Sequence, residues 1–177
     1  MKQVEAERLV FLDESGAKTN FTRLRGRCPI GERLPSKAPA GHWSTTTMIA
    51  AICLSGAIAG AVVKGAMDGD VFTAWVREAL LPGLKPGRIV VMDNLPAHKR
   101  PVVRRMIETA GCELWLLPPY SPDFNPIEMM WSKVKQLIRG AEPRTFDALV
   151  QAVFDAMNAV TAHDAVGFFG HCGYLDR

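Results

Sequence analysis

The sequence predicts an α/β fold, a mixed β-sheet flanked by helices, and three observations lead to it. Two short apolar runs, residues 8–13 and 88–93, have the uninterrupted hydrophobic character of strands that are buried on both faces. Two longer segments, residues 44–54 and 57–64, flank a Ser-Gly dipeptide, which is typical of a hairpin. Amphipathic segments lie between and after the later strands, so we expect helical crossovers there and an antiparallel meander before them.

The remaining elements are predicted from periodicity and from turn-forming residues. Residues 19–28 alternate bulky or apolar side chains with arginines, which predicts a half-exposed strand, and prolines then mark a loop. Residues 112–117 form a further apolar strand segment. Helices are predicted where apolar residues recur at helical spacing, namely at residues 68–80, 99–110, 127–139 and 146–160.

The composition is that of an ordinary globular domain, with 177 residues of which 48% are apolar and 22% charged. No apolar run reaches the ~20 residues that span a bilayer, and the mixed charges at the N-terminus do not fit a signal peptide. We therefore expect a cytoplasmic protein without a membrane partner. The four cysteines are widely scattered, which favours reduced, mostly buried thiols over a zinc site.

Basic residues are concentrated in the first four-fifths of the chain, although the formal net charge is only +3. Between Lys18 and Lys37 there are six basic residues and one acid, Glu32, whereas acids predominate after Thr145. Such a distribution suits a face that follows a phosphate backbone. The alternative, a set of ordinary solvated faces, stays open on charge alone.

Two predicted strands end in an aspartate, Asp13 and Asp93. In sheets covered by helices, functional residues gather at the carboxyl ends of neighbouring strands. Two carboxylates brought together there repel each other, and Mg²⁺ would compensate, since it takes oxygen ligands and binds through one or two carboxylates plus phosphates. The alternative is that each aspartate caps a turn, because turn-forming residues follow both of them.

A third carboxylate, Glu128, stands at the start of a predicted helix. It follows Asn125 and Pro126, so a capping box would explain it without any chemistry. Its place on the helix favours a functional role, because it begins a row that suits a metal beside a nucleic-acid backbone. This row runs at helical spacing through Glu128, Ser132, Lys135 and Arg139.

Three motifs occur in order: FLDESG at residues 11–16, MDNLPAHK at 92–99 and LPPYSPDFNPIE at 117–128. Together they resemble the mariner-like superfamily of DDE transposases, and most closely its bacterial insertion-sequence branch, the DDE superfamily endonucleases. The 34 residues between Asp93 and Glu128 match the spacing of that branch. WSTTT at residues 43–47 also resembles the central strand of the family.

The resemblance implies a ribonuclease-H-like fold with Asp13, Asp93 and Glu128 as the catalytic triad and metal ligands. Two Mg²⁺ or Mn²⁺ ions per site would support cleavage by water at the element's ends and transfer of the freed 3′-hydroxyl strand into target DNA. Asn94 and His98 would support the site by positioning metal or phosphate, although His98 could equally cap the next helix.

Other side chains are assigned from the same motifs and from charge. Glu14 should face away from Asp13 on its strand, which favours a structural or supporting role. Tyr120 and Trp131 match family positions but are expected to pack. Phosphate contacts are predicted for Lys99, Lys133, Lys135 and Arg139.

The predicted organisation is a ribonuclease-H-like DDE catalytic domain at residues 1–144 and a helical extension packed on it at residues 145–177. Related transposases carry an N-terminal helix-turn-helix region, and this sequence is expected to contain none. The expected partners are element-end and target DNA, with a homodimer in the synaptic complex. Two alternatives remain: a remnant that binds DNA or a partner without catalysis, and another ribonuclease-H-like nuclease.

Overall fold

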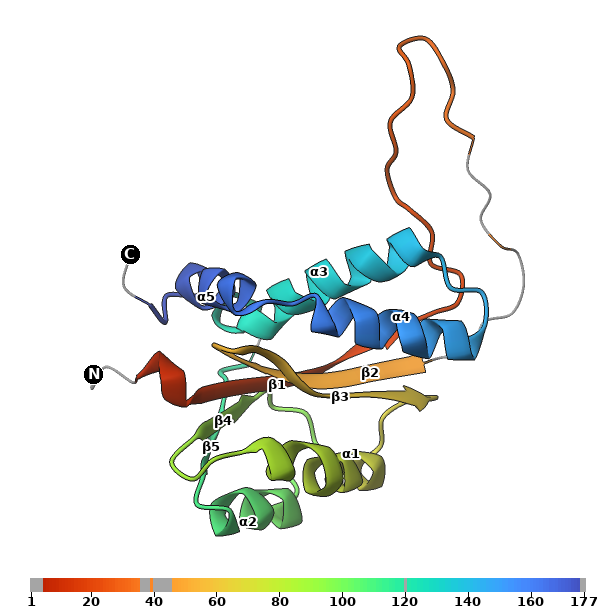
Figure 1. Ribbon diagram of the computed structural model, residues 1–177. Coiled ribbons are helices and arrows are strands. Elements are labelled where there is room, and N and C mark those ends of the chain that lie inside the picture. The colour runs from red at the N-terminus through yellow and green to blue at the C-terminus, as the bar shows by residue number, and fades with distance from the viewer. Residues whose placement is uncertain (1–4, 36–38, 40–45, 120, 176–177) are drawn as a thin grey trace.

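A five-stranded mixed sheet forms the centre of the computed structural model, which describes residues 5–35, 39, 46–119 and 121–175 (Figure 1). The strand order is β3-β2-β1-β4-β5. The strands are β1 (Leu9–Ala17), β2 (Thr46–Cys53), β3 (Gly56–Lys64), β4 (Ile89–Met92) and β5 (Glu113–Leu116). The first three pair antiparallel, whereas β4 pairs parallel with both β1 and β5.

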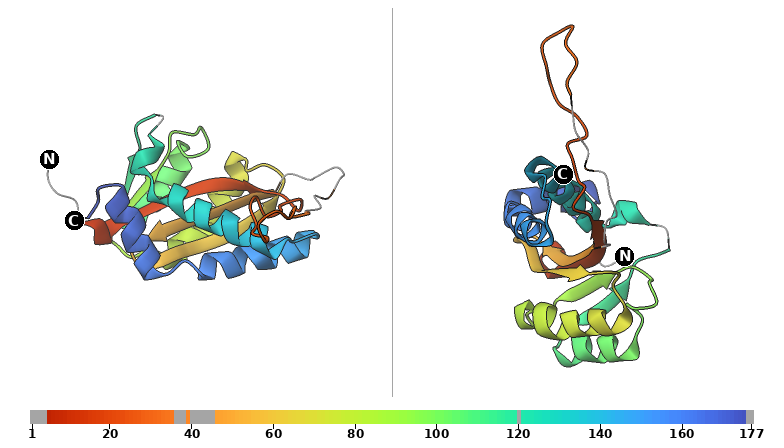
Figure 2. Two further views of the ribbon diagram at one scale, coloured as in Figure 1. Left: turned by 90° about the horizontal axis from the view of Figure 1, so that it is seen from above. Right: turned by 90° about the vertical axis from the view of Figure 1, so that its right-hand side faces the viewer.

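Helices cover both faces of the sheet (Figures 1 and 2). One layer holds α3 (Pro126–Ala141), α4 (Phe146–Asn158) and α5 (Ala162–His171). The other holds α1 (Gly69–Trp75), which continues into a π-helical segment, Val76–Leu80, and α2 (Pro101–Thr109). Short 3₁₀ turns occupy Ala6–Arg8, Leu81–Gly83 and Pro122–Phe124.

The core is divided by the sheet into two clusters, and β1 contributes to both because its side chains alternate between the faces. Phe11 points toward the α3–α5 layer, where its ring meets that of Phe169 edge to face at 5.4 Å. Val10 and Leu12 point toward the α1–α2 layer. The same alternation carries Asp13 to the first face and Glu14 to the second.

The predicted mixed sheet, its Ser-Gly hairpin and all four predicted helices are confirmed. The turn between β2 and β3 lies at Leu54 and Ser55, one residue earlier than the predicted Ser-Gly turn, and Gly56 pairs with Cys53. Trp131 packs in the core, 1% exposed, as expected. Residues 40–45, which include most of the WSTTT segment, and Tyr120 lie outside the described residues. No helix in the part of the chain described here is long and apolar enough to cross a membrane.

The strand predicted at residues 19–28 is wrong. These residues lie in a long excursion between β1 and β2 that reaches away from the sheet (Figure 1) and contains no strand among its described residues. No strand of the described chain lies beside these residues to pair with them. Of their apolar side chains, Phe21 packs against the core, whereas Leu24 is 77% exposed. A helix that periodicity did not predict, α5, closes the α3–α5 layer.

The prediction that Asp13 ends its strand is also wrong, because β1 continues to Ala17. The residues beyond Asp13 stay in the sheet since they pair with β2, from Glu14 opposite Ile49 to Ala17 opposite Thr46. The parallel pairing with β4, by contrast, stops at Phe11. Asp13 therefore lies beyond the last pair on the β4 side of a strand that continues on its other side.

Candidate active site

Three acidic side chains from three distant parts of the sequence line one pocket of about 440 Å³. Asp13 comes from β1, Asp93 from the residue after β4, and Glu128 from the first turn of α3. The rest of the wall is built mainly from the proline-rich turn that precedes α3, from Leu117 to Asn125. The structure therefore brings all three sequence-predicted carboxylates to one site.

The sheet explains why the two aspartates meet. In the parallel β1–β4 ladder, Leu9 lies opposite Ile89 and Phe11 opposite Val91. Continuing this register by two residues places Asp13 opposite Asp93, where the two strands part. Neighbouring strands lie roughly 4.8 Å apart, so carboxylates at such a point share a small volume.

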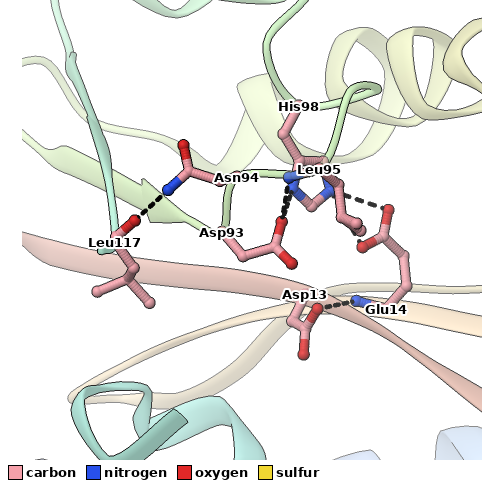
Figure 3. A network of polar contacts seen from close by, with 7 residues as sticks. All are labelled: Asp13, Glu14, Asp93, Asn94, Leu95, His98 and Leu117. Atoms are coloured by element: carbon pink, nitrogen blue, oxygen red, sulfur yellow. Dashed lines mark hydrogen bonds and ion pairs between the residues drawn. The ribbon is translucent and has the colours of Figure 1, made fainter. Parts of the chain in front are cut away.

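Asp93 is held by a turn and by a histidine (Figure 3). Its Oδ1 accepts a hydrogen bond from the backbone N–H of Leu95 at 2.9 Å and lies 2.6 Å from Nδ1 of His98. The turn interpretation of Asp93 is thus correct for one oxygen. No hydrogen bond from the described residues engages the other oxygen, Oδ2, so that atom is available to the pocket.

His98 connects Asp93 to a fourth carboxylate. Its ring is completely buried against Phe72, and its Nε2 lies 3.1 Å from both carboxylate oxygens of Glu14 (Figure 3). Burial lowers the pKa of His98, but the hydrogen bond and charge of Glu14, together with Asp93, outweigh it and raise the pKa above 6.5. A protonated imidazole would donate to both carboxylates.

Asn94 ties the Asp93 loop to the next strand. Its side-chain amide donates a hydrogen bond to the backbone carbonyl of Leu117, just beyond β5 (Figure 3). The bond fixes the spacing between the two pocket walls that Asn94 and Leu117 line.

Glu128 does not form the capping box that its sequence allows. Asn125 is the N-cap residue of α3 but makes no side-chain cap bond, and its own backbone N–H donates to Pro122 at 2.9 Å. The side chain of Glu128 is left exposed to the pocket. Asn125 is 5% exposed and lines the same pocket, and its buried Oδ1 has no hydrogen-bond partner among the described residues.

The pocket concentrates negative charge. The pKa of Asp13 is raised to about 7, chiefly because burial removes water from its carboxylate. The hydrogen bond from the Glu14 backbone N–H at 2.8 Å opposes this rise. The charges of Glu128, Glu14 and Asp93 add to it.

The donor set suits a hard cation, because three carboxylates and the side-chain oxygen of Asn125 surround one pocket. As the side chains lie here, no three acidic, histidine or cysteine groups of the described chain are close enough to ligate one ion together. Mg²⁺ commonly takes only one or two protein carboxylates and fills its remaining positions with water and substrate phosphate. The residues present therefore fit such an ion.

The predicted phosphate-contacting residues occupy different surroundings. Lys99 is exposed directly after His98, and Lys135 and Arg139 lie on α3 with partial exposure. Lys133 instead forms an ion pair with Asp164 of α5, with Nζ and Oδ2 2.5 Å apart. The pairing places Lys133 in the α3–α5 interface.

The sequence of this chain matches a known protein family. A family model described as DDE superfamily endonuclease matches residues 8–150. The Tc1 transposase of Caenorhabditis elegans is 28% identical over 91 residues, which are 51% of this chain and 33% of that protein. The chain thus spans about a third of the length of this curated relative.

Two solved structures show the same architecture. A pre-cleavage Mos1 transpososome aligns with a TM-score of 0.71 at 18% identity, over 96% of this chain and 54% of that chain. The Mos1 mariner transposase catalytic domain aligns with a TM-score of 0.67 at 16% identity, over 96% and 79%. At such identities the likeness concerns the fold, and it confirms the ribonuclease-H-like fold. With the family match extending across all three pocket carboxylates, this chain belongs to the DDE superfamily endonucleases.

Proposed function

We propose that this chain is the catalytic domain of a DNA transposase, which cleaves phosphodiester bonds at element ends and transfers the freed 3′-hydroxyl strand into target DNA. The observation that carries the proposal is the convergence of Asp13, Asp93 and Glu128 on one pocket from three separate elements. Each lies in one of the three motifs shared with transposases. Membership of the endonuclease family supports the same reaction class.

Asp13, Asp93 and Glu128 are the proposed ligands for Mg²⁺ or Mn²⁺. When bound, two such ions would activate the attacking water and stabilise the leaving 3′ oxygen. The protein's own contribution is positional. His98 holds Oδ1 of Asp93 so that Oδ2 faces the pocket, and Asn94 fixes the wall opposite. Solved Mos1 structures with Mg and with Mn support the choice of metal.

DNA is the proposed partner, with two copies of the chain acting on two element ends. Mos1 neighbours solved as paired-end and strand-transfer complexes support this arrangement. Among the predicted phosphate contacts we retain Lys99, Lys135 and Arg139. We assign Lys133 to the α3–α5 interface, because Asp164 already neutralises it.

Nicking of supercoiled plasmid tests the proposal. The wild-type chain should nick with Mg²⁺ or Mn²⁺ and not with EDTA, whereas Asp93→Asn and Glu128→Gln should lose at least 100-fold in rate while keeping their circular dichroism spectra. Asp147→Asn is the matched control, since it removes an exposed carboxylate from the first turn of α4, outside the pocket. Nicking that survives either pocket substitution would overturn the assignment and favour a non-catalytic DNA-binding role.

A further inference from the structure

A second cavity, which we call the α3 groove, lies between the excursion that follows β1 and the exposed face of α3. Its volume is about 590 Å³. Its polar lining consists of Arg23, Arg25, Ser132, Gln136 and Arg139. Among the described residues that line it, none also lines the carboxylate pocket and none is acidic.

The three arginines of the α3 groove carry charge that the described residues do not neutralise. None of the ion pairs formed within the described part of the chain involves Arg23, Arg25 or Arg139. The nearby Glu142 is paired with Arg144 at 2.7 Å. A groove with three uncompensated guanidinium groups and two neutral hydrogen-bonding side chains is suited to an anion with several oxygens.

Contacts at the base of the excursion hold two of the three arginines, Arg23 and Arg139. The guanidinium of Arg139 stacks over the ring of Phe21 at 5.1 Å, and Nη2 of Arg23 donates to the Gly140 carbonyl at 3.5 Å. Arg144 donates to the Phe21 carbonyl at 2.8 Å and so ties the excursion to the chain just beyond α3. The α3 groove is thus partly organised before any ligand arrives, which reduces the entropy lost on binding.

The α3 groove is connected to the carboxylate pocket by one face of α3. Ser132, Lys135 and Arg139 follow Glu128 at spacings of four, three and four residues, which keeps them on one side of the helix. Eleven residues of helix rise about 16 Å. Along B-DNA, with roughly 3.4 Å per base pair, this length corresponds to about five base pairs.

We propose that the α3 groove binds the DNA backbone about five base pairs from the phosphate that lies over the carboxylates. This rests on the proposed function for the identity of the ligand, and it adds Arg23 and Arg25 to the predicted contacts. Arginine contacts to phosphate are independent of sequence. Binding at the α3 groove would therefore set the path of the duplex rather than select a base.

Metal-free binding tests the α3 groove separately from cleavage. Fluorescence anisotropy with a labelled 30-base-pair duplex in EDTA compares the wild-type chain with Arg23→Gln/Arg139→Gln. The control is Arg77→Gln/Arg105→Gln, which removes two exposed arginines on the opposite layer. We expect about tenfold weaker binding for the groove variant and a salt-dependence slope smaller by about 2. Arg23→Lys/Arg139→Lys keeps both charges but loses the guanidinium geometry and the stack on Phe21, so its affinity should lie between those of the wild-type chain and the glutamine variant.

Mapping nicks on an end-labelled duplex tests the distance. The groove variant should lose nicking at interior positions but not within about five base pairs of one end, where no backbone reaches the α3 groove. A bound chain has one orientation relative to the 5′–3′ direction of the strand that it nicks, so the α3 groove always lies on the same side of the nick. For the labelled strand, nicking is therefore spared at one end only. Loss of binding equal to that of the control, or uniform loss of nicking along the duplex, would overturn the proposal. A wild-type chain that binds as expected but never nicks would refute the proposed function and leave the α3 groove standing.

Discussion

Nδ1 of His98 lies 2.6 Å from Oδ1 of Asp93, and the two side chains differ sharply in exposure: the imidazole is 0% exposed and the carboxylate 41%. A buried ring thus holds one oxygen of a pocket-lining carboxylate whose other oxygen makes no hydrogen bond within the described residues. Glu14 holds the far nitrogen of the same ring. The orientation of Asp93 therefore depends on two residues that do not line the pocket.

Replacing His98 should separate positioning from folding. His98→Ala removes both contacts and leaves a buried gap, so we expect the free energy of unfolding to fall by about 2–4 kcal/mol and nicking to fall at least tenfold. His98→Asn can still donate from a position close to that of Nδ1, so it should retain more nicking and a lower Mg²⁺ requirement than His98→Ala. Metal titrations of nicking, with urea unfolding of each variant, check this. Equal metal requirements in both variants would contradict a positioning role.

The ionised carboxylate of Asp13 should destabilise the metal-free protein at neutral and higher pH. Its folded pKa of about 7 lies above the ordinary value of 3.8, so the folded state resists ionisation. The cost grows as pH rises from about 4 and is complete above about 7. Asp13→Asn should therefore stabilise the EDTA-treated chain by about 2–4 kcal/mol at pH 8, and by less at pH 5.

Urea unfolding of the two proteins at both pH values measures that difference. Added Mg²⁺ should raise the Tm of the wild-type chain more than that of Asp13→Asn, because a ligand that binds only the folded state stabilises it. A pH-independent difference would show that burial and neighbouring charge do not act on Asp13 as described.

Long periodic segments and motif residues were predictable from sequence, whereas features set by tertiary pairing were not. The apolar run ending at Asp13 resembles a complete strand, but the strand extends to Ala17 because β2 supplies partners for residues with no strong strand preference of their own. The local sequence allows a capping box between Asn125 and Glu128, but it does not form. The Asn125 N–H donates to the Pro122 carbonyl and not to the Glu128 side chain. Neither outcome is encoded in the local sequence.

The missed helix α5 left a local signal. Thr161 and Asp164 form a capping box, with Thr161 Oγ1 accepting from Asp164 N–H at 3.2 Å and Asp164 Oδ2 accepting from Thr161 N–H at 2.8 Å. The Thr-x-x-Asp pattern is visible in the sequence. Gly167 and Gly170 obscured it, since glycine disfavours helix interiors. The contact between His98 and Glu14, 84 residues apart, had no signal at all.

Gly56 should not tolerate a side chain, because of both its backbone conformation and a close neighbour. Gly56 has φ of +116°, and a Cβ there would meet the backbone oxygen of Val160 at 2.8 Å. Gly56→Ala should lower the free energy of unfolding by about 2–4 kcal/mol through backbone strain and this clash. Gly65→Ala is the matched control, since Gly65 has φ of +91° and open space around its Cβ position. Chemical denaturation should show a larger loss for Gly56→Ala; equal losses would mean that the contact with Val160 contributes nothing.

Lys133 and Arg139 both lie on α3, but removing their charges should have different effects. Loss of the Lys133 charge should mainly lower thermal stability, and loss of the Arg139 charge should mainly lower DNA affinity. Lys133 is paired with Asp164, and this pair lowers the pKa of the Asp164 carboxyl, so the stability it supplies is present above about pH 4 and is lost in acid. Lys133→Gln should therefore lower the Tm at pH 7, with a smaller effect near pH 3, and change DNA affinity less than twofold. Arg139→Gln should lower the Tm less than Lys133→Gln does, since it loses only the stack on Phe21. It should weaken DNA binding severalfold, because its charge faces the α3 groove. Thermal melts measure the Tm of both variants, and fluorescence anisotropy measures their DNA affinity. A larger loss of DNA affinity for Lys133→Gln than for Arg139→Gln would show that Lys133 contacts DNA.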